Sequence, residues 1–352
     1  MDDDVKVKFW GVRGSIAAPL TAKDVREKQA QIVFKILEHY HRGIIPGHLS
    51  PEQLLALSPE QIIELFEKNT PATYGGNTSC VAVRFNDQIV ILDMGTGLRP
   101  LGDSLFPEMF KQKGLKGTFL LSHVHWDHIQ GLPFFAELYS NKELVDIKNE
   151  LFFLGGTDWQ KTAESCIAGQ MDPPNFPVAW SKIKKMTYKI GFDDMHDGKK
   201  LTIGESDVTC RFRVLDHPQE TYGTRMEFPS GKVIAYTTDN EPRDPLFPAE
   251  PLLWLAKGAK IWITDCQYTK GQYEGAKNEG GVSRQGWGHS YPEAVAVVAV
   301  KAGVEQVVLF HHDPNSSDEK IAQMVVHTQN LINEMGGTSK VIAAWEGLEL
   351  SL

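Results

Sequence analysis

The stretch that decides the fold is Ser122-His123-Val124-His125-Trp126-Asp127-His128, which follows directly on a short apolar run. In a strand, residues i and i+2 point to the same side, so His123 and His125 can converge on one ion. If the chain then turns into a helix near Asp127, that carboxylate and His128 face the same cavity from the other side. Imidazoles with a carboxylate are the expected ligands of zinc, or with more carboxylate of manganese or iron. The stretch therefore predicts a metal site where a strand ends.

Three further candidate ligands follow apolar runs elsewhere in the chain. His217, Asp239 and His311 each come shortly after a predicted strand. A metal cluster between two sheets needs donors in that position, so we predict that these three join the first four. Five other histidines stand in polar or helical surroundings, and we expect them to be structural or exposed: His39, His41, His48, His196 and His327.

Composition excludes several classes of protein. The chain has 352 residues, of which 41% are hydrophobic and 23% charged, as in ordinary globular proteins. The formal net charge of −9 makes general nucleic-acid binding unexpected, because phosphate affinity comes mostly from clustered Lys and Arg. A phosphate ester would therefore need local positive charge, which points towards metal.

Hydropathy, the amino-terminal residues and the cysteines favour a cytoplasmic protein. No apolar stretch approaches the roughly 18 residues of a membrane span, so we expect no membrane partner. The acidic start Met1-Asp2-Asp3-Asp4 is wrong for a signal peptide. The four cysteines form no CxxC pair, and we expect them to be reduced and buried.

Period-two and helical patterns predict an α/β architecture. Strands come in two comparable runs separated by single helices, which favours an αββα sandwich: two mixed sheets packed together with helices outside. The predicted strands span residues 5–9, 79–85, 88–93, 117–122, 208–215, 232–237, 260–265, 305–310 and 340–345. The predicted helices span residues 25–40, 292–302 and 318–335.

Residues 17–71 interrupt this plan, and we interpret them as a helical insertion within one domain spanning residues 1–352. Ser50-Pro51-Glu52-Gln53 and Ser58-Pro59-Glu60-Gln61 repeat one helix-start signal, with Ser as cap, Pro in the first turn and Gln closing a capping box. The insertion could be a surface elaboration, a lid over the site or a dimer contact.

These motifs together resemble the metallo-β-lactamase fold superfamily, and within it the phosphodiesterase branch of the tRNA 3′-processing endonuclease and the phosphoribosyl cyclic phosphodiesterase. The segments 9–15 (FWGVRGS) and 74–80 (YGGNTSC) resemble the amino-terminal signatures of that branch. Leu92-Asp93-Met94-Gly95-Thr96-Gly97 resembles the first superfamily motif, and the histidine-rich stretch resembles the second. The resemblance covers nearly the whole chain outside the insertion.

The resemblance implies two divalent ions, with zinc or manganese favoured and iron also compatible. The implied ligands are His123, His125 and His217 for one ion, and Asp127, His128 and His311 for the other, with Asp239 bridging. Asp93 would support the ligands without touching metal. His312 is adjacent to His311 and could exchange roles with it. The branch is often dimeric, so a homodimer is a further expectation.

A second signature separates phosphodiesterases from other members of the superfamily. Trp287-Gly288-His289-Ser290 resembles the histidine signature of the phosphodiesterase branch, and Asp265 stands where the branch keeps an acidic partner. The tRNA endonucleases usually have Glu at that position, and the chain shows no long Gly-rich arm for gripping tRNA. Both departures favour a small or cyclic nucleotide-like phosphodiester as substrate.

The expected mechanism is metal-assisted hydrolysis. A water bridging the two ions would have its pKa lowered from roughly 15.7 to about 7, so that hydroxide attacks phosphorus. His289, oriented by Asp265, would protonate the leaving oxygen, with Asp127 as a further catalytic carboxylate. The candidate substrate contacts, most of them in the glycine-rich loops, are Arg13, Asn77, Thr78 and His312.

Two other functions fit the same scaffold. One is a hydrolase of a lactone, thioester or sulfur ester, which the His289 signature does not favour. The other is a non-hydrolytic protein, such as a di-iron sensor. No flavin-binding or electron-transfer domain follows the fold, which counts against a redox enzyme.

Overall fold

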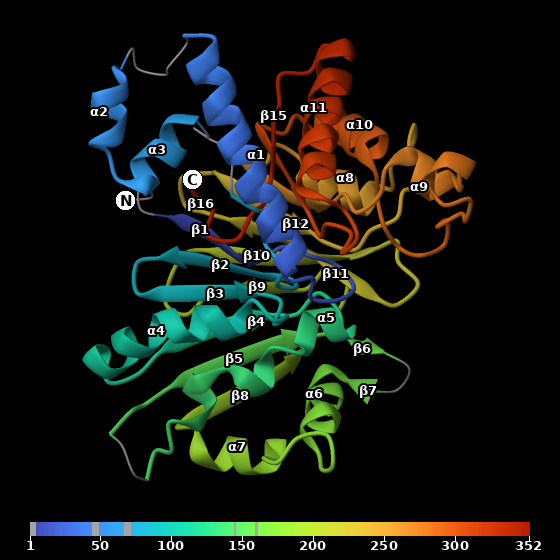
Figure 1. Ribbon diagram of the computed structural model, residues 1–352. Helices are drawn as coiled ribbons and strands as arrows, with labels where there is room; N and C mark the ends of the chain where they lie inside the picture. Colours follow the sequence, from blue (N-terminus) through green and yellow to red (C-terminus); the bar gives the residue numbers. More distant parts are fainter. Residues whose placement is uncertain (1–4, 44–48, 67–71, 144–145, 159–160) are drawn as a thin grey trace. The chain divides into compact units, whose positions relative to one another are not determined.

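The computed structural model describes residues 5–43, 49–66, 72–143, 146–158 and 161–352 (Figure 1). Met1–Asp4, His48 and parts of the predicted insertion (44–48 and 67–71) lie outside the described residues. By the density of its contacts the chain divides into two compact units, Met1–Ala18 with Gly76–Leu352, and Pro19–Gly75. The smaller unit spans the predicted insertion to within a few residues. That the larger unit is one hydrolase domain stays a prediction.

Within the larger unit, two mixed sheets of seven strands each form over the described residues. The first has the order β16-β1-β2-β3-β4-β5-β8. Its strands are β1 Lys6–Gly11, β2 Cys80–Phe85, β3 Gln88–Leu92, β4 Lys116–Leu120, β5 Glu150–Gly155, β8 Lys189–Asp194 and β16 Glu349–Ser351. β1 shows the predicted alternation, with Lys6 and Lys8 turned outward and Val7 and Phe9 buried.

The second sheet has the order β15-β14-β13-β12-β11-β10-β9. Its strands are β9 Lys200–Thr202, β10 Thr209–Leu215, β11 Thr221–Glu227, β12 Val233–Thr237, β13 Ile261–Asp265, β14 Gln306–Phe310 and β15 Lys340–Ala343. β12 to β15 pair in parallel, and every residue of β12 and β13 is buried, as expected for strands covered on both faces. A short separate hairpin joins β6 Thr157–Asp158 to β7 Lys161–Thr162.

Helices cover the outer faces of both sheets, which completes the predicted αββα sandwich (Figure 1). On the first sheet lie α4 Leu98–Gln112, α5 Trp126–Ile129, α6 Ala163–Met171 and α7 Trp180–Met186, with the 3-10 turns η2 Leu132–Phe134 and η3 Ala136–Tyr139. The helices in the part of the chain that forms most of the second sheet are α8 Glu250–Ala256, α9 Lys270–Glu274, η4 Lys277–Glu279, α10 Pro292–Ala302 and α11 Asp318–Glu334. α10 begins at Pro292 and ends before Gly303, whose φ of 65° suits a left-handed helix end.

Two apolar layers hold the larger unit together. One lies between the sheets and includes Phe9, Leu92, Phe212 and Phe310, all essentially buried. The other lies between the first sheet and its helices. At about 25 cal/mol per Å² of buried apolar surface, such layers supply the main driving force of folding. Cys80, Cys210 and Cys266 are buried as expected, whereas Cys166 is only half-buried.

The smaller unit is helical over its described residues, with α1 Ala22–His41, α2 Pro51–Leu55 and α3 Pro59–Phe66. Both repeated helix starts carry the predicted bonds: Gln53 N donates to Ser50 Oγ at 3.3 Å, and Gln61 N donates to Ser58 Oγ at 3.3 Å. No residue of α1 is buried, and its apolar residues Val25, Val33 and Leu37 are exposed, so α1 has no face in a core. Across the described chain, no helix combines the length and apolarity that crossing a membrane requires.

Candidate metal centre

Three predicted ligands and Asp93, their predicted support, lie just after the ends of strands of the two sheets. Asp93 follows β3, His123 follows β4, Asp239 follows β12 and His311 follows β14. Three of these residues have left-handed backbone, with φ of 60° at Asp93, 48° at Asp239 and 59° at His311. Positive φ at a residue other than glycine is uncommon and costs about 1–3 kcal/mol, and such strain gathers at functional sites.

The first group of donors combines both sheets. His123, His125, His217 and Asp239 each offer one ligand atom, and these atoms lie within 4.8 Å of one another. His123 Nε2 is 2.9 Å from His125 Nδ1 and 3.5 Å from Asp239 Oδ2. His217 Nε2 lies 3.7 Å from the same oxygen. The two histidines therefore converge, but they do so in the loop between β4, which ends at Leu120, and α5, and not within a strand as expected.

A second group contains Asp127, His128 and His311, again with ligand atoms within 4.8 Å. α5 begins at Trp126, so the chain does turn into a helix where the sequence predicts it. His311 Nε2 is 3.1 Å from Asp127 Oδ2 and 3.2 Å from His128 Nε2. The other carboxylate oxygen of Asp239, Oδ1, lies 3.3 Å from His128 Nε2 and 3.2 Å from His311 Nε2. Asp239 thus faces both groups, one oxygen to each.

Asp93 supports the candidate ligand His128 through a hydrogen bond. Its Oδ2 accepts hydrogen bonds from His128 Nδ1 at 2.8 Å, Ser122 Oγ at 2.8 Å and Tyr236 OH at 2.7 Å. Because His128 donates to Asp93 through Nδ1, its Nε2 is the ring atom left to bind a cation. Ser122 and Tyr236 were not among the predicted site residues. Ser122 opens the histidine stretch and could have been suspected, but nothing in the sequence marks Tyr236.

Burial favours the neutral form of His123 and His217, whereas at His128 the effect of burial is outweighed by Asp127 and Asp239, which raise its pKa well above its ordinary value. Burial lowers the pKa of His123 well below its ordinary value, and lowers the pKa of His217 to about 4. His217 Nε2 and His311 Nδ1 are buried and make no hydrogen bond to the described residues. Buried polar atoms without a hydrogen bond are rare, and here they call for a partner.

The carboxylates, by contrast, are kept ionised. Burial by itself raises the pKa of Asp127, but His128 and His311 lower it well below its ordinary value. The pKa of Asp239 is likewise lowered, against burial, by His311 and His128. Buried negative charges require compensating positive charge. Imidazole nitrogens beside aspartate oxygens are the donor set of divalent zinc, manganese or iron, so the residues present fit such cations.

His289 and Asp265 form a pair at the edge of the cluster. His289 Nδ1 donates to Asp265 Oδ2 at 2.7 Å, and Asp265 Oδ1 accepts from Gln267 N at 2.9 Å and Ser290 N at 3.3 Å. Burial alone would lower the pKa of His289, but Asp265 raises it to about 9. His289 Nδ1 is 4.0 Å from Asp239 Oδ2, which places the ring beside the metal ligands.

Two of the predicted substrate contacts are buried in loop structure instead. The Nη1 of Arg13 donates to the carbonyl oxygens of Asp313 and Ser316, each at 2.9 Å, and Arg13 is only 4% exposed. The hydroxyl of Thr78 is fully buried and accepts from Thr96 N at 2.9 Å. Both side chains therefore hold the loops together in this structure, and a contact of either residue with substrate stays a prediction.

The other two predicted contacts are likewise engaged elsewhere. Asn77 Nδ2 donates to Glu346 Oε2 at 3.0 Å. His312 Nε2 lies 3.0 Å from the carbonyl oxygen of Ala344, away from both donor groups. Among the two adjacent histidines it is His311 that enters the cluster. Consecutive residues at a strand end point in different directions, which sequence spacing could not resolve.

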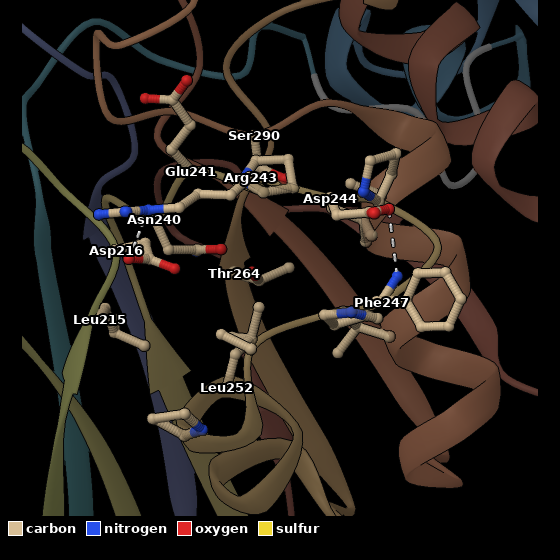
Figure 2. A pocket seen from close by; sticks show the side chains of 18 of the residues that line it. Leu215, Asp216, Asn240, Glu241, Arg243, Asp244, Phe247, Leu252, Thr264 and Ser290 are labelled. Atoms are coloured by element: carbon tan, nitrogen blue, oxygen red, sulfur yellow. Dashed lines mark hydrogen bonds and ion pairs between the residues drawn. The ribbon is translucent and has the colours of Figure 1, made fainter.

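A separate cavity of about 300 Å³ is lined by residues next to the predicted ligands in the sequence, among them Asp216 and Asn240 (Figure 2). Its lining is mostly apolar and includes Leu215, Leu252 and Trp262. At one side, Arg243 Nε pairs with Asp216 Oδ1 at 2.9 Å. The predicted metal ligands do not line it, so we do not assign the chemistry to this cavity.

The comparisons with known proteins agree with this fold and site. Residues 112–312, more than half of the chain, match the family model of the beta-lactamase superfamily domain. The chain therefore belongs to the beta-lactamase superfamily, and its fold is the metallo-β-lactamase fold.

Among curated proteins, the chain is similar to an uncharacterized protein of Mycobacterium tuberculosis, with 27% identity over 213 residues. That match covers 57% of this chain and 64% of the relative's own length.

Three solved structures share the fold. One is the metallo-beta-lactamase fold protein YhfI from Bacillus subtilis, with 15% identity, a TM-score of 0.57, and coverage of 99% of this chain and 100% of that one. A diphosphatase of the PhnP family has 14% identity, a TM-score of 0.56, and coverage of 99% and 98%. Human tRNase Z, short form, has 15% identity, a TM-score of 0.54, and coverage of 98% of each chain. At these identities the likeness concerns the fold.

Proposed function

We propose that the protein is a metal-dependent phosphodiesterase that hydrolyses a small or cyclic nucleotide-like phosphodiester. The observation that carries the proposal is the His289–Asp265 pair beside two donor groups that share Asp239. Membership of the superfamily supports a metallo-hydrolase. The fold is also that of a PhnP-family diphosphatase and of tRNase Z, both of which are named for acting on phosphate esters.

The residues have distinct roles in this proposal. His123, His125 and His217 would hold one divalent cation, and Asp127, His128 and His311 the second, with Asp239 between them. When bound, such cations supply Lewis acidity towards a phosphoryl oxygen and lower the pKa of a water molecule towards neutrality. Their charge also lets an acidic protein hold a phosphodiester anion.

His289 is the proposed general acid. Because Nδ1 donates to Asp265, the proton available for transfer is on Nε2, and it would pass to the leaving oxygen of the ester. Asp265 keeps the ring in that orientation through its own bonds to Gln267 N and Ser290 N. The buried position of both side chains limits competition from water.

The test combines metal analysis with a turnover screen. The purified protein would be assayed on bis(p-nitrophenyl) phosphate, cyclic nucleotides, cyclic ribose phosphates and short RNA, beside a lactone, a thioester and a sulfur ester. We expect bound divalent metal and turnover of small phosphodiesters that a chelator abolishes. Turnover of the lactone or thioester in preference to every phosphodiester would contradict the proposal.

Oligomeric state and cellular location need measurements of their own. A homodimer and a cytoplasmic location stay predictions of the sequence. The first can be measured by light scattering on the metal-loaded protein, and the second by fractionation of the source cells.

A further inference from the structure

Glu241 lies two residues after Asp239 and connects three parts of the site. Its Oε1 accepts hydrogen bonds from Gly286 N at 2.6 Å and Tyr273 OH at 2.9 Å, and its Oε2 accepts from Gly288 N at 2.8 Å. Figure 2 shows the Glu241 carboxylate directed away from the neighbouring cavity. One side chain therefore binds the backbone of the loop that leads into His289.

The loop needs this support because it is rich in glycine. Gly286 and Gly288 have φ of 82° and 91°, a conformation that other residues rarely adopt. Gly288 also approaches a candidate ligand closely: a Cβ added there would lie 2.1 Å from His217 Cδ2. Arg284 anchors the start of the loop through Asp313 Oδ2 at 3.3 Å and the ring of Tyr268, whereas Gly286 and Gly288 have no side chain and are held through their backbone N–H groups.

The other connections of Glu241 lead back to the metal ligands. Its backbone N donates to Asp216 O at 2.7 Å, immediately before His217. At the start of the loop, Arg284 N donates to Tyr273 O at 3.0 Å, and Tyr273 is the same residue whose hydroxyl binds Glu241. Hydrogen bonds to an ionised acceptor are about twice as strong as neutral ones.

We propose that Glu241 is a positioning residue of this site, which fixes the 284–288 loop so that His289 stands beside Asp239 in the orientation needed for proton transfer. The catalytic meaning rests on the proposed phosphodiesterase function. Whether Glu241 orders the glycine-rich loop can be measured by hydrogen exchange, which does not depend on turnover.

The experiment compares Glu241→Ala and Glu241→Gln with the wild type in the full-length, metal-loaded protein. Glutamine keeps one acceptor oxygen but turns an NH₂ group towards the other backbone donor, so it should rescue part of the effect. Glu279→Gln serves as the matched control, because Glu279 is also half-buried and accepts a bond from Thr269 Oγ1, but does not bind the loop. The readouts are hydrogen exchange over residues 284–290, metal content, and kcat and KM on bis(p-nitrophenyl) phosphate.

We expect Glu241→Ala to lower kcat by about 10- to 100-fold, since small misplacements of a catalytic group have effects of that size. KM and metal content should stay near wild type, exchange should rise in residues 284–290, and Glu241→Gln should fall between the two. The inference is overturned if kcat is unchanged, if metal content falls in step with kcat, or if exchange over the loop does not rise. A wild type with bound metal but no phosphodiester turnover would contradict the proposed function, while the exchange comparison would still decide whether Glu241 orders the loop.

Discussion

The two halves of the larger unit contribute to the metal centre in different ways. The first half supplies four donors from one continuous segment, residues 122–128, at the end of β4. The second half supplies its donors singly, from separate strand ends and loops: His217, Asp239 and His311, with the His289–Asp265 pair beside them. The first set is held by local chain geometry and the second by the pairing of strands. Substitutions in the two halves should therefore differ in how they change metal binding and turnover.

The largest effect should come from Asp239→Ala, because this residue of the second half faces both donor groups. We expect metal content to fall and kcat/KM to drop on the order of 10³-fold or more, since metal catalysis supplies several kcal/mol. Elemental analysis and turnover measure the two effects. Asp103→Ala, an exposed carboxylate on α4, is the control. Full metal occupancy in the Asp239 variant would remove it from the bridging position.

His289→Ala should separate proton transfer from metal binding within the second half. We expect metal content to stay at the wild-type level while kcat falls about 10²–10⁴-fold, the usual contribution of a general acid. The exposed His196→Ala is the matched control. Asp239, Asp265, His289 and His311 also offer ligand atoms within 4.8 Å. Loss of metal in the His289 variant would therefore make it a ligand instead.

Asp93→Asn tests the support in the first half. The amide retains one oxygen but loses the ionised acceptor for His128, Ser122 and Tyr236. We expect metal affinity to fall about 10- to 100-fold, as is typical when a partner of a metal ligand is changed. Titration with zinc or manganese against a competing chelator measures it. An unchanged affinity would mean that packing alone orients His128.

Glu137→Gln should have the smallest effect on the metal site. It tests a buried carboxyl group that has no positively charged neighbour in the part of the chain that the structure describes, in contrast to Asp127 and Asp239. Glu137 lies in η3, is fully buried, and its carboxyl oxygens make no hydrogen bond to the other described residues. Burial raises its pKa from 4.5 to about 7, the opposite of the shift at Asp127 and Asp239.

The sign of the pH dependence follows from that raised pKa. The neutral form favours the folded state below pH 4.5, and this contribution is lost as pH rises through about 7. Relative to wild type, E137Q should therefore gain free energy of unfolding between pH 5 and pH 8, on the order of 3 kcal/mol at most. Denaturant unfolding at both pH values measures it, with metal content as the control. Parallel stability curves for the two proteins would refute the assignment.

Secondary structure was predictable where local signals agreed. α10 has the predicted bounds, because Pro292 and Gly303 mark its two ends. α4 was missed, since Gly102 and Pro107 interrupt its helical pattern. β5 and β8 were also missed, and β8 shows no alternation, with a mixed, mostly half-exposed burial pattern. Both strands are fixed by parallel pairing to their neighbours rather than by their own residues.

The sequence by itself determined that His123, His125, Asp127 and His128 lie close together, because they stand within six consecutive residues of the chain. It also determined the αββα architecture, through the two runs of apolar strands. Only the tertiary structure decided that His311 rather than His312 enters the cluster, that Asp239 faces both donor groups, and that Glu241 holds the loop before His289. These relations join residues far apart in the chain, and their distances are set by strand pairing and the packing of loops, which no local pattern encodes.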